Sequence, residues 1–368
     1  MAPGSRRSRG TLRGIFGVLV AVVLLWLLFR GTDWSELGGS LRGANLAWLG
    51  VAQILVWASA FTRVQRWSYV VRAAHSASYR SLLAATQIGV LVNFAIPARA
   101  GELVRSWVLS RLATIPLARS LAMVVLDRVN DVVGLLAVLL LAALALTGDA
   151  DVALPAGSFG NSEAFVVSSS IVRPVAWTLA TAVLASVLLL VGLHTRRDEV
   201  LPRVRAVLSL VSTALAERAV GLLASFAEGL HVFRSRGDLA RAIVWSLVSW
   251  GVDVASTAAI LVAFDLDFPW YAPCVMLSFV AVAILVPLTP GTVGQFHLPA
   301  VAGLLLSAPD VEPARAKAVA IVDHLSMLVP VTALGLYCLL RERLGLLEVV
   351  RRSLGSESAP VVGPEPGG

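Results

Sequence analysis

A charged block, NFAIPARAGELVRSW, interrupts an apolar stretch of the chain at residues 93–107. It places Arg99, Glu102 and Arg105 beside Pro97 and Gly101. Proline removes a helix donor and glycine permits a sharp turn, so the charges are predicted to lie at a break in the helix. Arginine matches phosphate bidentately, and the block is therefore suited to binding a phosphate-bearing head group.

A second charged motif, LDRVND, contributes Asp127, Arg128 and Asp131. The two aspartates are four residues apart and share a helix face, and Arg128 is three before Asp131 and reaches it as well. Arg99, Arg105 and Arg128 are predicted to form a cluster on the cytoplasmic side that holds a lipid phosphate. The carboxylates of both motifs would neutralise these arginines or contact a cationic head group.

Further ionisable residues lie within apolar runs. Asp253 lies in the middle of the run 243–264, and Asp323 and His324 lie within the run 318–340. Ionisable groups at membrane depth are costly and usually functional, which makes Asp253 a candidate binding residue. The alternative, for each of them, is an ion pair or hydrogen bond that only holds helices together.

A second interruption, PLTPGTVGQFH at 287–297, resembles the first. Both have a proline, three residues, a glycine and a polar side chain after a short apolar run. The candidate binding residues in the second interruption are Pro290, Gly291, Gly294, Gln295 and His297. Paired Pro/Gly interruptions in two halves of a chain indicate a binding site between transporter repeats, here inverted ones. Chance similarity over six positions is the alternative.

The composition is that of a membrane protein. Of the 368 residues, 57% are hydrophobic and 14% are charged, and the mean hydropathy is +0.82. The basic residues flank apolar runs, as orientation signals do, which argues against a nucleic-acid partner despite a net charge of +7. Cys274 and Cys338 give no disulfide or zinc spacing. No motif predicts a catalytic residue, a cofactor or a metal, so the sequence favours a protein without enzymatic activity.

The predicted fold is an all-α polytopic membrane protein with about six full spans and two re-entrant or broken hairpins, about eight transmembrane segments in all. The predicted spans are 14–29, 46–61, 129–147, 175–194, 243–264 and 318–340. The hairpins cover 81–111 and 271–306. Basic residues place both termini in the cytoplasm and the protein in the cytoplasmic membrane.

The chain divides into three regions by composition. Residues 1–13 form a basic cytoplasmic N-terminus, residues 14–343 a transmembrane domain, and residues 344–368 a cytoplasmic tail predicted to be disordered. Within the domain, 196–240 is basic and has apolar residues at spacings of three and four. This pattern predicts an amphipathic helix that lies on the inner leaflet or packs against its own bundle.

The motifs resemble those of the lysylphosphatidylglycerol synthase transmembrane (flippase-like) family over roughly residues 13–343. The family's first block fits at Asn93, Pro97, Gly101, Glu102 and Arg105, and LDRVND and PLTPGTVGQFH resemble its other two blocks. The resemblance implies an inner-membrane protein that recognises, and translocates, an anionic phospholipid or lipid-linked head group. The C-terminal aminoacyltransferase domain of some members is not expected here, so any such transferase would be a separate partner.

The sequence departs from the family pattern at three positions. Asp127 stands where the family usually has Glu, Thr292 replaces a Gly, and His297 stands where an acid is expected. The last change removes a fixed negative charge and substitutes a group that titrates near neutrality. A substrate or mechanism different from that of other members is therefore expected if the acid is needed.

Three hypotheses follow. The first is a flippase-like protein in which the arginine-bearing break receives a lipid head group. The second is an integral-membrane transferase acting on a lipid or a polyprenyl-phosphate substrate, with Glu102 or Asp127 as general base. The third is a non-catalytic membrane scaffold whose charges only join helices.

Overall fold

The computed structural model describes residues 4–95, 100–145, 152–154, 165–167, 195–210, 212–229, 235–285, 288–346 and 348–350, with a few further positions between 178 and 192. Pro97 and Arg99, much of the predicted span 175–194 and the predicted tail from residue 351 lie outside these residues.

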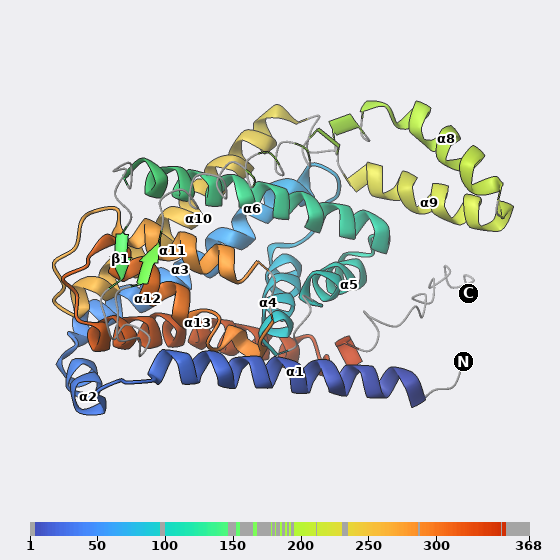
Figure 1. The fold of residues 1–368 in the computed structure, drawn as a ribbon. Helices are drawn as coiled ribbons and strands as arrows, with labels where there is room; N and C mark the ends of the chain where they lie inside the picture. Colours follow the sequence, from blue (N-terminus) through green and yellow to red (C-terminus); the bar gives the residue numbers. More distant parts are fainter. Residues whose placement is uncertain are drawn as a thin grey trace.

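The described chain is a bundle of helices with one small hairpin of strands (Figure 1). In order, the elements are α1 (Gly4–Phe29), α2 (Trp34–Gly43), α3 (Leu46–Arg72), α4 (Tyr79–Ala95), α5 (Gly101–Ala113), α6 (Leu117–Ala145), β1 (Val152–Leu154), β2 (Phe165–Val167), α8 (Arg197–Ser209), α9 (Thr213–Gly229), α10 (Arg236–Ala263), α11 (Ala272–Ala283), η2 (Pro290–Thr292), α12 (His297–Ser307) and α13 (Pro313–Arg341). The two strands pair antiparallel, with Val152 opposite Val167. The predicted class, an all-α polytopic membrane protein, is confirmed.

Among the described residues, three helices are long and apolar enough to cross a membrane: α3, α10 and α13. A fourth span is obtained if α1 from Phe16 and α2, which meet at 90°, are counted as one broken span. The predicted span 129–147 lies in α6 up to Ala145, and α6 is 29 residues long. The figure of about six full spans therefore stays a prediction.

Two of the predicted spans clearly cover only part of a longer helix. The span expected at 46–61 continues as α3 to Arg72, and the span expected from 129 begins as α6 at Leu117. In both cases the prediction stopped at charged residues, whereas the helix continues through them. Asn45 starts α3 by capping it, since its side chain accepts from the backbone N–H groups of Ala47 and Trp48.

Both predicted hairpins are present as pairs of short helices. α4 packs on α5, and α11 packs on α12. The backbones of the first pair lie close together: a Cβ added to Gly89 would lie only 2.8 Å from the carbonyl oxygen of Gly101. In the second pair, a Cβ on Gly303 would lie 2.8 Å from Met276 Cα. Glycine at these positions lets the paired backbones approach.

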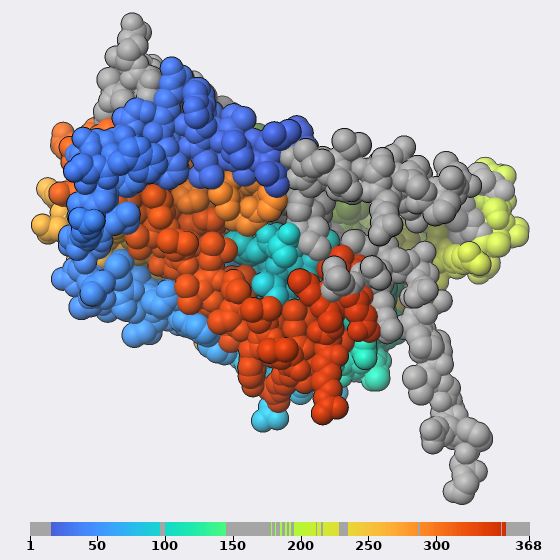
Figure 2. Space-filling model, turned by 90° about the horizontal axis from the view of Figure 1, so that it is seen from below, coloured from blue at the N-terminus to red at the C-terminus, as the bar shows by residue number. Residues whose placement is uncertain are grey.

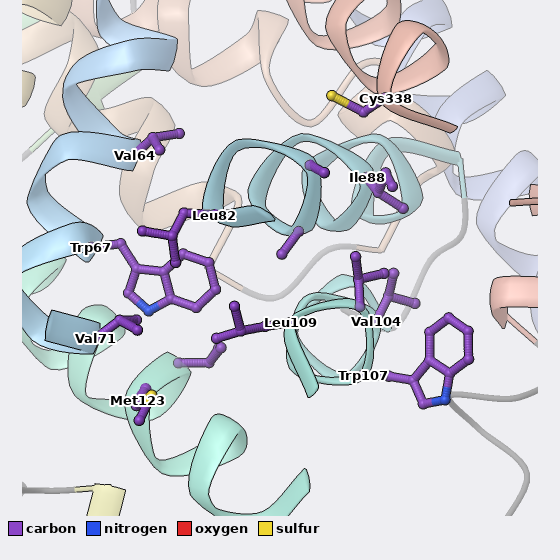
Figure 3. Close-up of a cluster of buried hydrophobic side chains, with 14 of the residues drawn as sticks. Val64, Trp67, Val71, Leu82, Ile88, Val104, Trp107, Leu109, Met123 and Cys338 are labelled. Atoms are coloured by element: carbon purple, nitrogen blue, oxygen red, sulfur yellow. The ribbon is translucent and has the colours of Figure 1, made fainter. Parts of the chain in front are cut away.

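Each hairpin has its own apolar core. The first core is formed by α3, α4, α5 and α6, and Figure 3 shows Trp67 of α3 pointing toward Leu82 of α4, Leu109 of α5 and Met123 of α6. The second core joins α11 and α12 to α13 and to the ends of α1 and α10. α1 runs along one face of the bundle beside η2 and α12, as Figure 2 shows from below. An inverted repeat stays a prediction, but each break is held by a separate core.

The basic segment 196–240 forms two helices and the start of a third. α9 packs against α6 and α8 packs against α9, and the pair extends beyond the body of the bundle (Figures 1 and 2). None of the described residues of α8 is buried. The predicted amphipathic segment is thus a helical arm whose outer helix, α8, packs on α9 and has no buried side chain among its described residues.

Candidate functional site

The candidate site is built on α3 and α10, which lie antiparallel along their whole length. At one end, the Asn45 N–H donates to the Ala263 carbonyl at 2.7 Å, and at the other end Arg72 pairs with Asp238. Between them, the Ser249 hydroxyl donates to Thr62 at 3.0 Å. This register sets Ser59 and Arg63 of α3 opposite Asp253 of α10.

The first break is held by Asn93, at the end of α4. Its side-chain oxygen accepts from the Gly101 N–H at 2.8 Å, and its Nδ2 donates to Glu102 Oε2 at 3.1 Å. A Cβ on Gly101 would lie 2.0 Å from the Gly89 carbonyl oxygen, so no larger residue fits there without moving the backbone. The predicted residues Asn93, Gly101 and Glu102 therefore lie together, and α5 begins directly at the break.

A buried aspartate joins this hairpin to α3. Asp127 of α6 is fully buried, and its two oxygens bind two arginines: Oδ1 accepts from Arg66 Nε at 2.9 Å and Oδ2 accepts from Arg105 Nη1 at 2.7 Å. These side chains belong to three different helices. Asp127 is therefore the point at which α3, α5 and α6 are tied together inside the bundle.

Arg105 is enclosed rather than open to a ligand. Its guanidinium lies 3.6 Å from the centre of the Trp67 ring, the indole that Figure 3 shows between α3, α4, α5 and α6. A cation over an indole face gains electrostatic attraction, and desolvation strengthens it. Among the described residues, Arg105 Nε and Nη2 have no hydrogen-bond partner. The indole face and Asp127 are therefore the main compensation for its buried charge.

The second carboxylate of the motif, Asp131, forms ion pairs with three arginines. Its Oδ1 pairs closely with Arg66 and lies 3.7 Å from Arg63 Nη1, and its Oδ2 accepts from Arg128 Nη1 at 3.4 Å. The Trp250 indole N–H donates to the Asp131 backbone carbonyl at 3.0 Å and lies 3.3 Å from Oδ1. Asp131 thus links the buried part of the site to its outer part.

The outer part continues in two directions. Arg63 pairs with Asp253 through Nη2 at 2.5 Å, and Asp253 also accepts from the Ser59 hydroxyl. Arg128 pairs with Glu102 at 3.1 Å, which closes the network back onto the first break. Asp253, a predicted site residue, is therefore part of the same network as Glu102.

The network contains four arginines and four carboxylates among the described residues, and its formal charges cancel. The members are Arg63, Arg66, Arg105, Arg128, Glu102, Asp127, Asp131 and Asp253. Buried charges in an apolar medium must be compensated in this way. Sequence analysis had missed Arg63 and Arg66 because they follow an apolar run and were interpreted as orientation signals. Their spacing of three residues, which puts both on one face of α3, was the available clue.

The second break is a tight turn. Gly291 and Gly294 have φ values of 61° and 77°, which favour glycine. Gln295 spans the turn, since its Oε1 accepts from the Leu288 N–H at 2.9 Å and its Nε2 donates to the Ala283 carbonyl at 2.6 Å. Pro290 starts the short η2 helix. These four predicted residues therefore form one turn. Among the described residues, no ion pair joins this turn to the charged network.

His297 begins α12 and is buried. Its Nδ1 accepts from the Gly294 N–H at 3.1 Å, which fixes the position of the ring. The ring of His324 on α13 lies 4.7 Å from it, edge to face, and His324 Nε2 is 2.9 Å from the Gly291 carbonyl. The histidine expected to replace an acid of the family therefore contacts the turn and a second histidine.

The two breaks meet. A Cβ added to Gly291 would lie 4.0 Å from the carbonyl oxygen of Phe94, the residue after Asn93. α4 also packs on η2. The end of the first hairpin's leading helix thus touches the turn of the second hairpin, as expected for two interruptions at one interface.

Comparison with known proteins gives the family. The chain matches the family described as lysylphosphatidylglycerol synthase TM region over residues 14–335. It belongs to this family. The match includes both breaks and all eight members of the charged network, so the network is built entirely from residues of the family's transmembrane region. The chain is a multi-pass membrane protein of that family.

The comparison also found a curated relative. The chain is 30% identical over 330 residues to "Glycosyltransferase AglD" of Haloferax volcanii. The matched region covers 84% of this chain and 51% of the relative, so the chain spans about half the length of that protein. No solved structure gave a significant match.

Proposed function

We propose that this family member binds the head group of an anionic phospholipid or a lipid-linked substrate and moves it across the cytoplasmic membrane. The observation that carries the proposal is the charged network itself, set in an apolar bundle at the broken hairpin. Four arginines gathered within an apolar helical bundle are costly to keep, and arginine is the side chain best suited to phosphate. The family's name, which refers to a synthase of a modified phospholipid, supports a lipid ligand.

The role of each group follows from its place in the network. Arginines supply the phosphate contact. Glu102, Asp131 and Asp253 neutralise the arginines when no lipid is bound, or contact a cationic part of the head group when lipid is bound. Asn93, Gly101, Pro97 and Arg99 belong to the first break, the hairpin that would move. Pro290, Gly291, Gly294, Gln295 and His297 belong to the second break, against which the first one would move.

Cytoplasmic termini and a cytoplasmic-membrane location are part of this proposal. Basic residues at the N-terminus, in the α8–α9 arm and after α13 support this orientation. Reporter fusions that are active only in the cytoplasm or only outside it, placed at each end of the chain, test it directly. Activity of the external reporter at either terminus would contradict the orientation.

The test of the function has two stages. Protein purified in mild detergent is analysed by mass spectrometry for lipids that co-purify with it. It is then reconstituted into vesicles with a head-group-labelled fluorescent phospholipid, and a membrane-impermeant quencher measures how fast the inner-leaflet label becomes accessible. We expect enrichment of an anionic or polyprenyl-phosphate lipid and faster exposure than in vesicles without protein. No enrichment together with no acceleration would overturn the proposal.

The similarity to a glycosyltransferase favours a second candidate, an integral-membrane transferase that acts on a lipid or polyprenyl-phosphate substrate, alone or with a separate transferase partner. Glu102, with 20% of its side chain exposed, is the carboxylate on which this candidate depends most. A covalent product formed from a polyprenyl phosphate and a sugar donor, and lost in Glu102→Gln, would support it. If lipid binds but no covalent product forms, only the transport candidate remains.

A further inference from the structure

The side chains of the charged network differ in their exposure. The inner members are nearly inaccessible: the exposed fraction of the side chain is 0% for Asp127, 2% for Arg66 and 5% for Arg105. The outer arginines are far more open, with 32% of Arg63 and 36% of Arg128 exposed. A ligand that enters without unfolding the bundle therefore meets the outer arginines first.

Both inner arginines are also held in buried ion pairs. Arg105 is stacked on Trp67 and bound to Asp127, and Arg66 pairs with both Asp127 and Asp131. Releasing either one would remove one of the two arginines that neutralise the buried Asp127, which is costly in an apolar interior. Arg105, which the sequence predicts to contact the lipid phosphate, is therefore less accessible to a ligand than Arg63 or Arg128.

The outer arginines converge on one carboxylate. Arg63 Nη1 lies 3.7 Å from Asp131 Oδ1, and Arg128 Nη1 lies 3.4 Å from Asp131 Oδ2. They reach it from different helices, α3 and α6, and so approach its two oxygens separately. A phosphate group offers two oxygens in a similar arrangement, and it fits the same pair of guanidinium groups.

Each outer arginine is anchored on its other side. Arg63 holds Asp253 and Arg128 holds Glu102, through contacts shorter than those to Asp131. Among the described residues, the contacts to Asp131 are therefore the longest ion-pair contacts that either arginine makes. If they are given up, Asp131 keeps its close pair with Arg66 and its contact with the Trp250 indole. An exchange at this point leaves no buried group unpaired.

We propose that Arg63 and Arg128 are the pair that binds the lipid phosphate, in exchange for their contacts to Asp131. This inference rests on the proposed function and assigns the ligand contact to residues on α3 and α6 instead of to Arg99 and Arg105. Arg66, Arg105 and Asp127 act as positioning residues that hold the three helices while the outer pair changes partner.

The test compares matched variants by native mass spectrometry in detergent with added lipid. Arg63→Gln and Arg128→Gln each remove one outer charge. Arg72→Gln is the control, because Arg72 lies on the same helix as Arg63 and is also ion-paired, with Asp238, but lies outside the network. The probes are phosphatidylglycerol, a polyprenyl phosphate, phosphatidylcholine and inorganic phosphate, so that a lipid phosphate is distinguished from a free one.

We expect wild type and Arg72→Gln to retain an anionic lipid equally, and each outer variant to bind it about tenfold or more weakly, the effect of losing one charged hydrogen bond. Arg63→Lys and Arg128→Lys keep the positive charge and its ion pairs, so they serve as folded variants if the glutamine variants fail to fold. They should still bind the lipid more weakly, because lysine lacks the planar fork of arginine. Inorganic phosphate alone is expected not to displace the lipid.

Two results would overturn the inference, and they have different consequences for the proposed function. If wild type retains an anionic lipid and all four outer variants retain it equally, Arg63 and Arg128 are not the ligands and the proposed function still stands. If wild type itself has no preference for any phosphate-bearing lipid over phosphatidylcholine, the proposed function fails and this inference fails with it.

Discussion

Removing the charge of Asp127 is the sharpest test of how the network holds the bundle. In Asp127→Asn the side chain keeps its size, but among the described residues Arg105 loses its one carboxylate partner and Arg66 keeps only Asp131. Breaking a buried pair by removing one partner costs about 3–5 kcal/mol, because the remaining charge is left uncompensated. Arg105 is 5% exposed, so water cannot make up the loss. We expect a destabilisation near that range.

The assay is thermal unfolding in detergent, followed by tryptophan fluorescence. For a chain of this size, 1 kcal/mol corresponds to roughly 2 °C in Tm, so the expected fall is roughly 6–10 °C. Glu217→Gln is the control: Glu217 pairs with Arg205 at 2.8 Å, but 62% of its side chain is exposed. Pairs in water contribute little, and its Tm should stay within about 2 °C of wild type.

A double variant separates charge from packing. Adding Arg105→Gln to Asp127→Asn removes the uncompensated cation, so the double variant should unfold at a higher temperature than Asp127→Asn alone. A Tm for Asp127→Asn equal to that of the control would refute the reasoning. So would a double variant whose loss equals the sum of the two single losses, because the two charges would then act independently.

Three further predictions concern the hairpins and the register of the helices. Gly101→Ala should cost about 3 kcal/mol or more, because its Cβ would lie 2.0 Å from a backbone oxygen, whereas Gly50→Ala, which meets nothing within 4 Å, should leave Tm unchanged or raise it slightly. Gln295→Ala should lower Tm by roughly 2–6 °C through loss of the hydrogen bonds that span the second turn, and no change would contradict that role. Thr62→Cys with Ser249→Cys, in a chain whose native cysteines are replaced by alanine, should form a disulfide on mild oxidation. Thr62→Cys with the exposed Leu247→Cys should not, as peptide mass spectrometry can establish.

The sequence predicted well the features that depend on local chemistry. Proline and glycine at the two interruptions indicated breaks, and short helix pairs meet there. Glu102, Asp127, Asp131 and Asp253 were singled out because acids are rare in apolar runs, and all four belong to one network. In each case the signal is a residue type that is costly in its own surroundings, which a single sequence reveals.

The partners of these groups could not be predicted in the same way. α3 was expected to end at Phe61 because Arg63 and Arg66 follow it, and a charged residue appears to end an apolar span. The helix continues to Arg72, and carboxylates on α6 and α10 neutralise those arginines. Neutralisation by a residue more than sixty positions away leaves no local pattern. The same limit applies to Arg105, whose indole partner Trp67 lies on another helix.

The arrangement of contacts also suggests how the site responds to a ligand. Asp127 ties α3, α5 and α6 through short, buried contacts, whereas the links of Arg63 and Arg128 to Asp131 are longer and more exposed. In the proposed exchange, a phosphate would replace the contact between Arg63 of α3 and Asp131 of α6 and the contact that Arg128 makes within α6, and the buried tie would stay intact. The first hairpin, joined to this tie through Arg105 and to the outer side through Glu102, would then pivot about Asp127 rather than detach. We propose that the broken helix and the network act together: the break would let the hairpin move, and the buried aspartate would limit how far it moves.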